Sequence, residues 1–444
     1  MRTRPGRITG VKAASDVGAG DQPKHVLVIA QPPRAETLTE VGVQVSIMGR
    51  LVDTKASLNL RPPPAVTVCG QADALASQNM SRTPARRRRR ATLASLAAEL
   101  NVSRTTISNA YNRPDQLSAD LRERVLETAK RLGYPGPDPV ARSLRTRKAG
   151  AVGLVLTEPL NYAFSDPAAV SFVGGLAESC EEVGQGLLLV AVGPGRSVTE
   201  GSHAVLNAGV DGFVVYSVAD DDPYLDVALE RNLPVVIVDQ PKDVPGTSGV
   251  CIDDRAAMRK LAEYVVALGH RELGLLTMRL GRERTPGARA VASPERLRSP
   301  HFHVQRERID GVRDAMAAGG LEPDSLTVVE SYEHMPTSGG AAAEVALEAN
   351  PRITALVCTA DVLALSAMDY LRARGIYVPG QMTVTGFDGV PEALRRGLST
   401  VAQPNLEKGR VAGKLLHTPP RSGLPVDEVL PTELMRGRTA GPPG

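Results

Sequence analysis

The stretch Thr92-Leu-Ala-Ser-Leu-Ala-Ala-Glu-Leu-Asn-Val-Ser-Arg-Thr-Thr-Ile-Ser-Asn-Ala-Tyr-Asn112 decides how the first part of this chain folds. Leu93, Leu96 and Leu100 recur at the spacing of one helical face. Thr92 stands directly before them, and a threonine hydroxyl can accept a hydrogen bond from a free amide of a first helical turn. The pattern therefore predicts a short helix that begins after Thr92.

A turn and a second helix follow in the same stretch. Asn101 tolerates the left-handed backbone conformation that ends such a helix, and Val102 can fill the angle between two helices. Ser103 is a second candidate N-cap, and Ile107 and Ala110 behind it share one face. The stretch therefore predicts two helices joined by a tight turn.

The outer face of the second predicted helix is small and polar. It carries Arg104, Thr105, Ser108 and Asn109. Such side chains suit base edges and phosphates, and the N-terminal residues of a recognition helix usually contact the bases. This is the layout of a helix-turn-helix that reads DNA; the alternative is an ordinary helical hairpin within a larger core.

A third helix and a basic segment continue the pattern. Ser118 can cap the third helix and Gly133 can end it. After a proline-rich linker, residues 138–148 predict a short arginine-rich helix, with Asp138 as N-cap and Pro139 at the first helical position. A helix of this length is unstable alone, and its arginines repel one another without a polyanion. We therefore expect it to fold when bound to DNA.

Beyond residue 149, short runs of valine and leucine alternate with amphipathic stretches, which is typical of buried parallel strands and the helices between them. Two doubly wound α/β lobes with a cleft between them are the expected architecture. Ligands of open α/β sheets bind beyond the carboxyl ends of the strands, so polar residues there are the candidates for a binding site. The predicted strands are Ala151–Leu156, Gly186–Ala191, Gly212–Tyr216 and Pro234–Asp239 in the first set, and Leu273–Leu276, Ala355–Cys358 and Met382–Phe387 in the second. The predicted helices are Ala168–Val183, Pro223–Arg231, Arg255–Leu268, Arg306–Ala318, Gly340–Asn350 and Val362–Arg374.

Taken in order, these motifs resemble the lactose-repressor (LacI/GalR) family over residues 92 to about 439. The resemblance rests on the segments 102–108 and 141–144, on Asn112 and on the sensor motifs in family order. It implies an N-terminal all-α helix-turn-helix domain with a hinge helix, followed by a two-lobed α/β periplasmic-binding-protein-like sensor domain. It also implies a homodimeric transcriptional regulator, a repressor that binds palindromic double-stranded operator DNA under the control of a small-molecule effector.

The resemblance assigns DNA contacts as well. It implies that Arg104 and Thr105 read bases in the major groove and that Leu144 enters the minor groove as an apolar wedge. Asn109 stands where many family members carry arginine, which bears on the operator sequence rather than on the mode of binding. The other implied DNA contacts, at the helix starts, the phosphates and the hinge, are Thr92, Leu93, Ser103, Thr106, Ser108, Asn112, Gln116 and Ala141.

Five residues are the candidates for contact with an effector, which the resemblance implies to be a sugar or a related metabolite. Asp361 lies in a segment similar to the family's Asn-Asp motif, whose Asp takes sugar hydroxyls, and Arg308 matches an Arg that points into the cleft. Asp220 follows a predicted strand, and the loop before the first long helix places Phe164 and Asp166 at the cleft mouth. For each charged residue the alternative is a surface charge or a helix cap.

Two other features of the sensor half draw attention. Asp388, in a turn between the lobes, is expected to bond backbone amides rather than ligand.

Residues 279–300 form a loop that is rich in arginine, glycine and proline and is longer than the corresponding loop of most family members. The sequence predicts no function for that loop.

The chain has 444 residues and a net charge of +3, and its charge is unevenly distributed. Arg86 to Arg90 form a basic arm that can lie along phosphates. Residues 1–79 show no sustained periodicity, so we expect them to be disordered or to come from an over-extended start-site assignment; the alternative is a small appended module. The expected domains are 1–79 (extension), 80–90 (basic arm), 91–137 (helix-turn-helix), 138–148 (hinge helix) and 149–440 (effector-binding lobes).

Other classes of protein fit less well. The segment Gly193–Gly195 lacks the third glycine of a phosphate loop, and no catalytic or metal-binding arrangement stands out, so neither enzyme activity nor a cofactor is expected. The four cysteines, Cys69, Cys180, Cys251 and Cys358, lie far apart and are expected to be reduced. Without a membrane span or signal peptide, we expect a cytoplasmic, nucleoid-associated protein. The alternatives are a solute-binding protein or an α/β enzyme with an appended helical domain.

Overall fold

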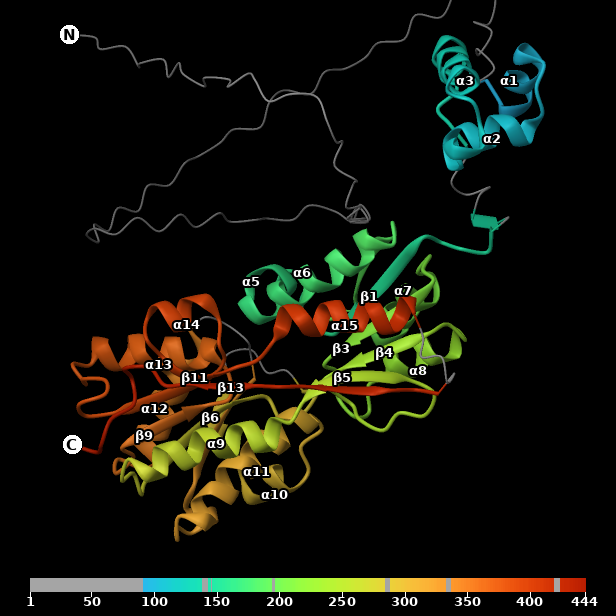
Figure 1. Cartoon of the computed structure of the whole chain (residues 1–444). Coiled ribbons are helices and arrows are strands. Elements are labelled where there is room, and N and C mark those ends of the chain that lie inside the picture. Colours follow the sequence, from blue (N-terminus) through green and yellow to red (C-terminus); the bar gives the residue numbers. More distant parts are fainter. Residues whose placement is uncertain are drawn as a thin grey trace, which may run out of the picture. The chain divides into compact units, whose positions relative to one another are not determined.

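The computed structural model describes residues 91–137, 143–144, 146–193, 196–283, 288–332, 337–418 and 424–444. The predicted extension, the basic arm, Ala141 and the start of the predicted hinge helix lie outside the described residues. The described chain divides after residue 142 into a helical unit and an α/β unit, and each is described by itself (Figure 1).

Three helices and one 3₁₀ turn form the helical unit: α1 (Leu93–Leu100), α2 (Arg104–Asn112), η1 (Pro114–Gln116) and α3 (Ala119–Leu132). Thr92 and Ser95 form a reciprocal capping box at the start of α1. Asn101, with a φ of 55°, ends α1 in the left-handed conformation, as predicted. The core of the unit consists of Leu96, Ala97, Ile107, Ala110, Val125 and Ala129.

The first lobe of the α/β unit is a six-stranded sheet in the order β12-β5-β4-β3-β1-β2, with all neighbours parallel. Its strands are β1 (Ala151–Leu156), β2 (Gly186–Ala191), β3 (Gly212–Tyr216), β4 (Val235–Val238), β5 (Ser248–Ile252) and β12 (Asp427–Leu430). The sheet is sandwiched between helices, which places its core on both faces. Helices α6 (Pro167–Glu182) and α15 (Asn405–His417) cover one face, and α7 (Val198–Leu206) and α8 (Pro223–Glu230) cover the other; α5 (Tyr162–Ser165) precedes α6.

The second lobe is a seven-stranded sheet in the order β13-β11-β10-β9-β6-β8-β7, in which only the two edge strands are antiparallel. Its strands are β6 (Leu273–Met278), β7 (Arg289–Val291), β8 (Thr327–Ser331), β9 (Ala355–Cys358), β10 (Thr383–Asp388), β11 (Ser399–Ala402) and β13 (Glu433–Met435). Helices α9 (Asp254–Ala267) and α11 (His303–Ala318) cover one face, and α12 (Ser338–Ala349) and α13 (Asp361–Ala373) cover the other. Three short pieces complete the lobe: α10 (Pro294–Arg298), η2 (Pro323–Ser325) and α14 (Pro391–Arg395).

The chain passes between the two lobes three times (Figure 1). The crossings lie between β5 and α9, between β11 and α15, and between β12 and β13. Residues at these crossings are shared by the two lobes, so a change in lobe closure must act on them.

The structure confirms the predicted alternation of strand and helix and the two doubly wound lobes. Every predicted strand and helix of this region is present, with ends that differ by a few residues. The sequence did not predict β5, β8, β11, β12, α7 or α15. In β5, β8 and α7, serine, threonine and glycine weaken the apolar pattern. The unexplained loop at 279–300 forms the edge strand β7 and the short helix α10.

No helix in the described residues is long and apolar enough to cross a membrane. The same residues contain no group of three or more His, Cys, Asp and Glu side chains that could hold a metal ion. Cys180, Cys251 and Cys358 are free thiols, and Cys69 lies outside the described residues.

Candidate DNA-binding surface and effector cleft

The start of α2 presents its polar side chains to solvent. Ser103 caps the helix by accepting a hydrogen bond from the Thr106 amide at 2.9 Å, and its hydroxyl lies 2.8 Å from that of Thr106. Arg104 and Thr105, which follow the cap, are exposed. A capped helix N-terminus with two free side chains in its first turn is a suitable arrangement for contact with base edges and phosphates.

Further along α2, the amide side chains bond within the helical unit. Asn109 Nδ2 donates to Gln116 Oε1 at 3.1 Å, and Asn112 Nδ2 donates to the carbonyl of Ser108 at 2.9 Å. These bonds fix the orientation of side chains at the exposed end of the helix-turn-helix. Ser108 and Asn109 are half-buried, whereas Asn112 and Gln116 are exposed.

Leu144 is the described residue of the predicted hinge helix with the largest apolar exposure. It is helical, and 77% of its surface is exposed. A leucine with so much apolar surface in water has little to contribute to the fold of a monomer. Such exposure of an apolar side chain is typical of a residue that contacts another molecule.

A cavity of about 80 Å³ lies between the two lobes, at the carboxyl ends of their strands. Both lobes contribute aromatic and amide groups to its wall, and the first lobe also contributes hydroxyl groups. The first lobe contributes Leu156, Thr157, Glu158, Tyr162, Tyr216, Ser217 and Gln240, and the second contributes Met278, Arg279, Phe302 and Gln305. Such a mixture of rings and a few directed polar groups is typical of a small-molecule site.

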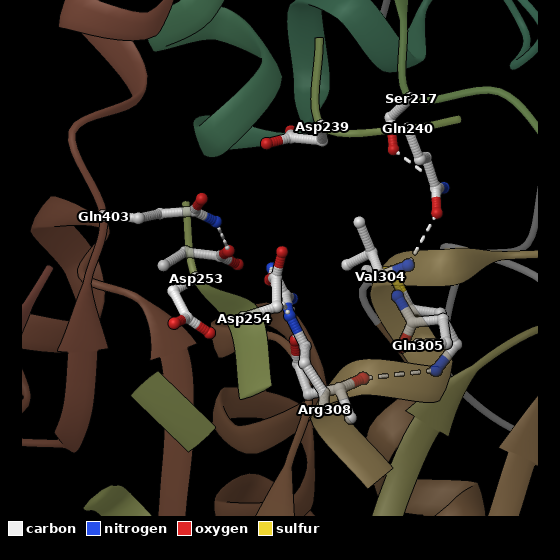
Figure 2. Close-up of polar contacts among 12 residues, drawn as sticks. Ser217, Asp239, Gln240, Asp253, Asp254, Val304, Gln305, Arg308 and Gln403 are labelled. Atoms are coloured by element: carbon white, nitrogen blue, oxygen red, sulfur yellow. Dashed lines mark hydrogen bonds and ion pairs between the residues drawn. The ribbon is translucent and has the colours of Figure 1, made fainter. Parts of the chain in front are cut away.

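Contacts between the lobes surround this cavity. Arg279 donates to Glu158 and stacks on the Phe302 ring, with 4.9 Å from its guanidinium carbon to the ring centre. The Gln240 side chain accepts a hydrogen bond from the Val304 amide at 2.7 Å (Figure 2). The cavity is thus closed by direct bonds between residues of opposite lobes.

Carboxylates make the surroundings of the cavity acidic. Burial raises the pKa of Tyr162 and of Tyr216 well above the usual range, and nearby carboxylates raise both further. Asp166 and Asp388 act on both tyrosines. A negative group would therefore be unfavourable near these hydroxyls.

Arg308 is buried and held on every side. Its Nε and Nη2 both lie 2.8 Å from Asp254 Oδ1 (Figure 2). Its Nη1 donates to the Thr359 carbonyl at 2.6 Å. Its guanidinium carbon lies 3.8 Å from the centre of the Phe387 ring. The predicted effector residue Arg308 thus holds Asp254 in place in this structure.

Asp361 is fully buried at the start of α13, and both its oxygens accept hydrogen bonds. Oδ2 accepts from the Val390 amide at 2.8 Å and Oδ1 from the Thr400 hydroxyl at 2.6 Å. Burial raises the pKa of Asp361 to about 6. Its carboxyl group therefore fixes the turn that follows β10.

Asp388, in that turn, bonds both a backbone amide and a side chain. Its Oδ2 accepts from the Asp361 amide at 3.3 Å and its Oδ1 from Gln403 Nε2 at 2.6 Å. Its φ of 131° is unusual for a residue other than glycine. Burial, followed by the nearby Asp361, raises the pKa of Asp388 well above its usual range. The expected bond to a backbone amide is present, and the side chain also reaches the second crossing.

The comparisons with known proteins agree with this architecture. Residues 262–440 match the model of the periplasmic binding protein-like domain. An HTH-type transcriptional regulator from Mycolicibacterium smegmatis is 78% identical over 357 residues, which cover 80% of this chain and 98% of the relative. A LacI-family regulator from Corynebacterium glutamicum has a crystal structure with 38% identity and a TM-score of 0.61, covering 78% of this chain and 98% of that one. The chain belongs to the LacI family of transcriptional regulators. A complex of the transcriptional regulator CelR with cellobiose has 28% identity and a TM-score of 0.56, covering 79% of this chain and all of that one.

In this LacI-family chain the other three candidate effector residues, Phe164, Asp166 and Asp220, are not among those that line the cavity. Phe164 is 59% exposed. Asp166 caps α6 by accepting from the Ala169 amide at 2.9 Å. The Asp220 amide donates to the His301 carbonyl at 2.9 Å, across the two lobes. Their contact with an effector stays a prediction.

The sequence missed two buried charged residues at the lobe crossings. The predicted helix Arg255–Leu268 begins one residue after Asp254, and the sequence predicted neither α15 nor a role for Lys408. Asp254 is 1% exposed, and so is Lys408, whose ammonium lies 2.6 Å from Asp239. An acidic pair directly after a strand, as at Asp253 and Asp254, was the signal that could have identified the first of them.

Proposed function

We propose that this LacI-family regulator is a homodimeric repressor of a palindromic operator, controlled by a sugar or related metabolite bound between its lobes. The observation that carries the proposal is the cavity between the lobes, with aromatic and amide groups from both lobes and hydroxyl groups from the first. The cellobiose complex of CelR supports the choice of a sugar. The site of action would be chromosomal DNA in the cytoplasm.

The DNA contacts that we propose follow the exposed surfaces of the helical unit and the hinge. Arg104 and Thr105 would contact base edges, because they are the exposed side chains of the first turn of α2. Leu144 would act as an apolar wedge in the minor groove. The remaining predicted contacts would hold phosphates and set the register on the duplex. Those with described positions are Thr92, Leu93, Ser103, Thr106, Ser108, Asn109, Asn112 and Gln116.

Control of DNA binding would arise at the lobe crossings. A ligand that binds one degree of lobe closure better than another shifts the population toward it, by no more than that difference in affinity. The first strand of the first lobe, β1, begins three residues after the predicted hinge helix 138–148. A change in closure would therefore alter the spacing of two hinges in a dimer.

The test is binding of the full chain to a labelled duplex from its own upstream region, followed by fluorescence anisotropy. We expect specific binding with a stoichiometry of two chains per site, and a change in affinity on addition of one compound from a sugar panel. Binding no tighter than to a scrambled duplex of equal length would contradict the repressor. Specific binding that no sugar alters would contradict the proposed effector class and leave DNA binding intact.

A further inference from the structure

We propose that Asp254 contacts the effector directly, and that the effector presents a hydroxyl group to it and carries no negative charge. This inference rests on the proposed function and names the chemistry of its ligand. It assigns a specificity-determining role to a residue at the first lobe crossing.

The bonds of Asp254 are distributed unevenly between its two oxygens. Arg308 Nε and Nη2 both lie 2.8 Å from Oδ1, instead of one donor on each oxygen. Oδ2 is buried and has no hydrogen-bond partner among the described residues, although Asp254 as a whole is only 1% exposed. A buried carboxylate oxygen that accepts no hydrogen bond raises the free energy of the protein. A ligand that donates a hydrogen bond to this oxygen removes that cost and therefore binds more tightly.

The position of Asp254 suits contact with a molecule between the lobes. It is the first residue of α9, directly after the crossing from β5. Arg308, which stacks on the Phe387 ring, fixes it from the side of the second lobe. Figure 2 shows Asp239 of the first lobe and Asp254 of the second on opposite sides of the site, with Arg308 beneath Asp254. An oxygen of Asp254 is therefore held by one lobe at the place where the lobes meet.

The charges around Asp254 exclude an anionic ligand. Burial raises the pKa of Asp254, and the carboxylate of Asp239 adds to this effect. The nearby cations are already engaged: all three nitrogens of Arg308 are bonded within its lobe, and Lys408 bonds to Asp239 and Gln403. Arg279 on the cavity wall bonds to Glu158. A phosphate or carboxylate would meet acceptors, whereas a hydroxyl could donate to Oδ2.

The test uses two matched variants of the full chain, Asp254→Asn and Asp253→Asn. Asp253 is the exposed N-cap of the same helix, and asparagine caps a helix as well as aspartate does. Asp254→Asn keeps one oxygen for Arg308 and replaces the acceptor at Oδ2 with an amide donor. Operator release is measured against monosaccharides, disaccharides and sugar alcohols, and against hexose phosphates and uronates.

We expect an uncharged compound to alter operator affinity of the wild type, and its half-maximal concentration to rise about tenfold or more in Asp254→Asn. In Asp253→Asn the half-maximal concentration should stay within about twofold of the wild-type value. Equal response of Asp254→Asn and wild type would overturn the role of Asp254. A response to a phosphate or uronate alone would overturn the charge argument and leave effector control standing. If no compound in the panel acts, the proposed effector class fails instead.

A second measurement does not depend on the folding of the variant. Single-deoxy analogues of the responding compound are titrated into the wild-type chain by calorimetry. Loss of one hydroxyl should weaken binding about tenfold or more, because the acceptor at Asp254 would lose its donor. If every deoxy analogue binds within threefold of the parent compound, the inference is wrong.

Discussion

Lys408 Nζ lies 2.6 Å from Asp239 Oδ1, and both side chains are withdrawn from solvent. The same ammonium lies 2.5 Å from Gln403 Oε1, and the Gln403 amide donates to Asp388 at 2.6 Å. Lys408 belongs to α15, which covers the first lobe, whereas Asp388 ends β10 of the second. A continuous chain of hydrogen bonds therefore runs from one lobe to the other along the second crossing.

Replacing Lys408 with methionine should destabilise the α/β unit by about 3 kcal/mol, because it leaves the half-buried Asp239 carboxylate without its cation. The double variant Lys408→Met/Asp239→Asn should recover most of the loss, because it removes both charges. Urea unfolding followed by circular dichroism measures the three free energies. Lys414→Met, an exposed position on the same helix, is the control and should change stability by less than about 0.5 kcal/mol. Equal effects of Lys408→Met and Lys414→Met would contradict a role for the buried pair.

Asp361 should make the unfolding free energy depend on pH. Burial raises its pKa from 3.8 to about 6. A carboxyl group whose pKa is higher in the folded state than in the unfolded state stabilises the folded state fully at a pH below its unfolded-state pKa. This contribution is lost as the pH rises through its folded-state pKa. Between about pH 4 and pH 6 the unfolding free energy of the wild type should therefore fall by on the order of 2–3 kcal/mol more than that of Asp361→Asn.

Asp361→Asn is a suitable comparison because its amide can keep the same partners. Its oxygen can accept from the Val390 amide, and its NH₂ can donate to Thr400 if that hydroxyl turns to accept. Denaturation curves for the two proteins at several pH values provide the measurement. Parallel pH profiles for wild type and variant would show that the carboxyl group of Asp361 does not titrate in this range.

Arg104→Ala should weaken operator binding by about 1–3 kcal/mol if its side chain contacts a base edge. The loss should be confined to the operator, with binding to unrelated duplex little changed. Arg124→Ala, which removes an exposed arginine from α3, is the matched control. A uniform loss on operator and unrelated DNA would instead identify Arg104 as a phosphate contact.

Leu144→Ala should reduce operator affinity about tenfold or more without changing the thermal stability of the α/β unit, because the side chain is already exposed. Leu206→Ala, an exposed leucine on α7, is the control. DNA bending, followed by energy transfer between dyes at the duplex ends, should fall with Leu144→Ala alone. An unchanged bend would argue against a wedge at this position.

Local patterns were sufficient to predict most of the fold. Caps at Thr92, Ser103 and Ser118 and the left-handed Asn101 and Gly133 are encoded within a few residues of each helix end, so the sequence locates the helices. Apolar runs locate the buried strands for the same reason.

The polar site could not be predicted in the same way, because its bonds join residues far apart in the chain. Arg308 and Asp254 are separated by 54 positions, and Lys408 and Asp239 by 169. Asp361 looked like a ligand contact, but whether its oxygens face a cleft or a turn depends on Thr400 and Val390. Such partners become visible only when the fold brings distant segments of the chain together.

The contacts of the loop at 279–300 could not be predicted from the sequence either. Its composition predicted no function, but in the fold it joins the lobes at several points. Arg279 bonds to Glu158, Arg282 to Asp221, and His301, just after the loop, accepts from the Asp220 amide. Arg296 ties the loop to the buried Glu330 of β8 at 2.9 Å.

The most direct test of ligand-controlled DNA binding is the affinity of the full chain for the active sugar, measured with and without a saturating operator duplex. Coupling between two binding sites is reciprocal. If the sugar changes operator affinity by a given factor, the operator must change sugar affinity by the same factor. We predict equal factors of about 5 to 150. A sugar affinity that is identical with and without operator would contradict control of DNA binding from the cleft.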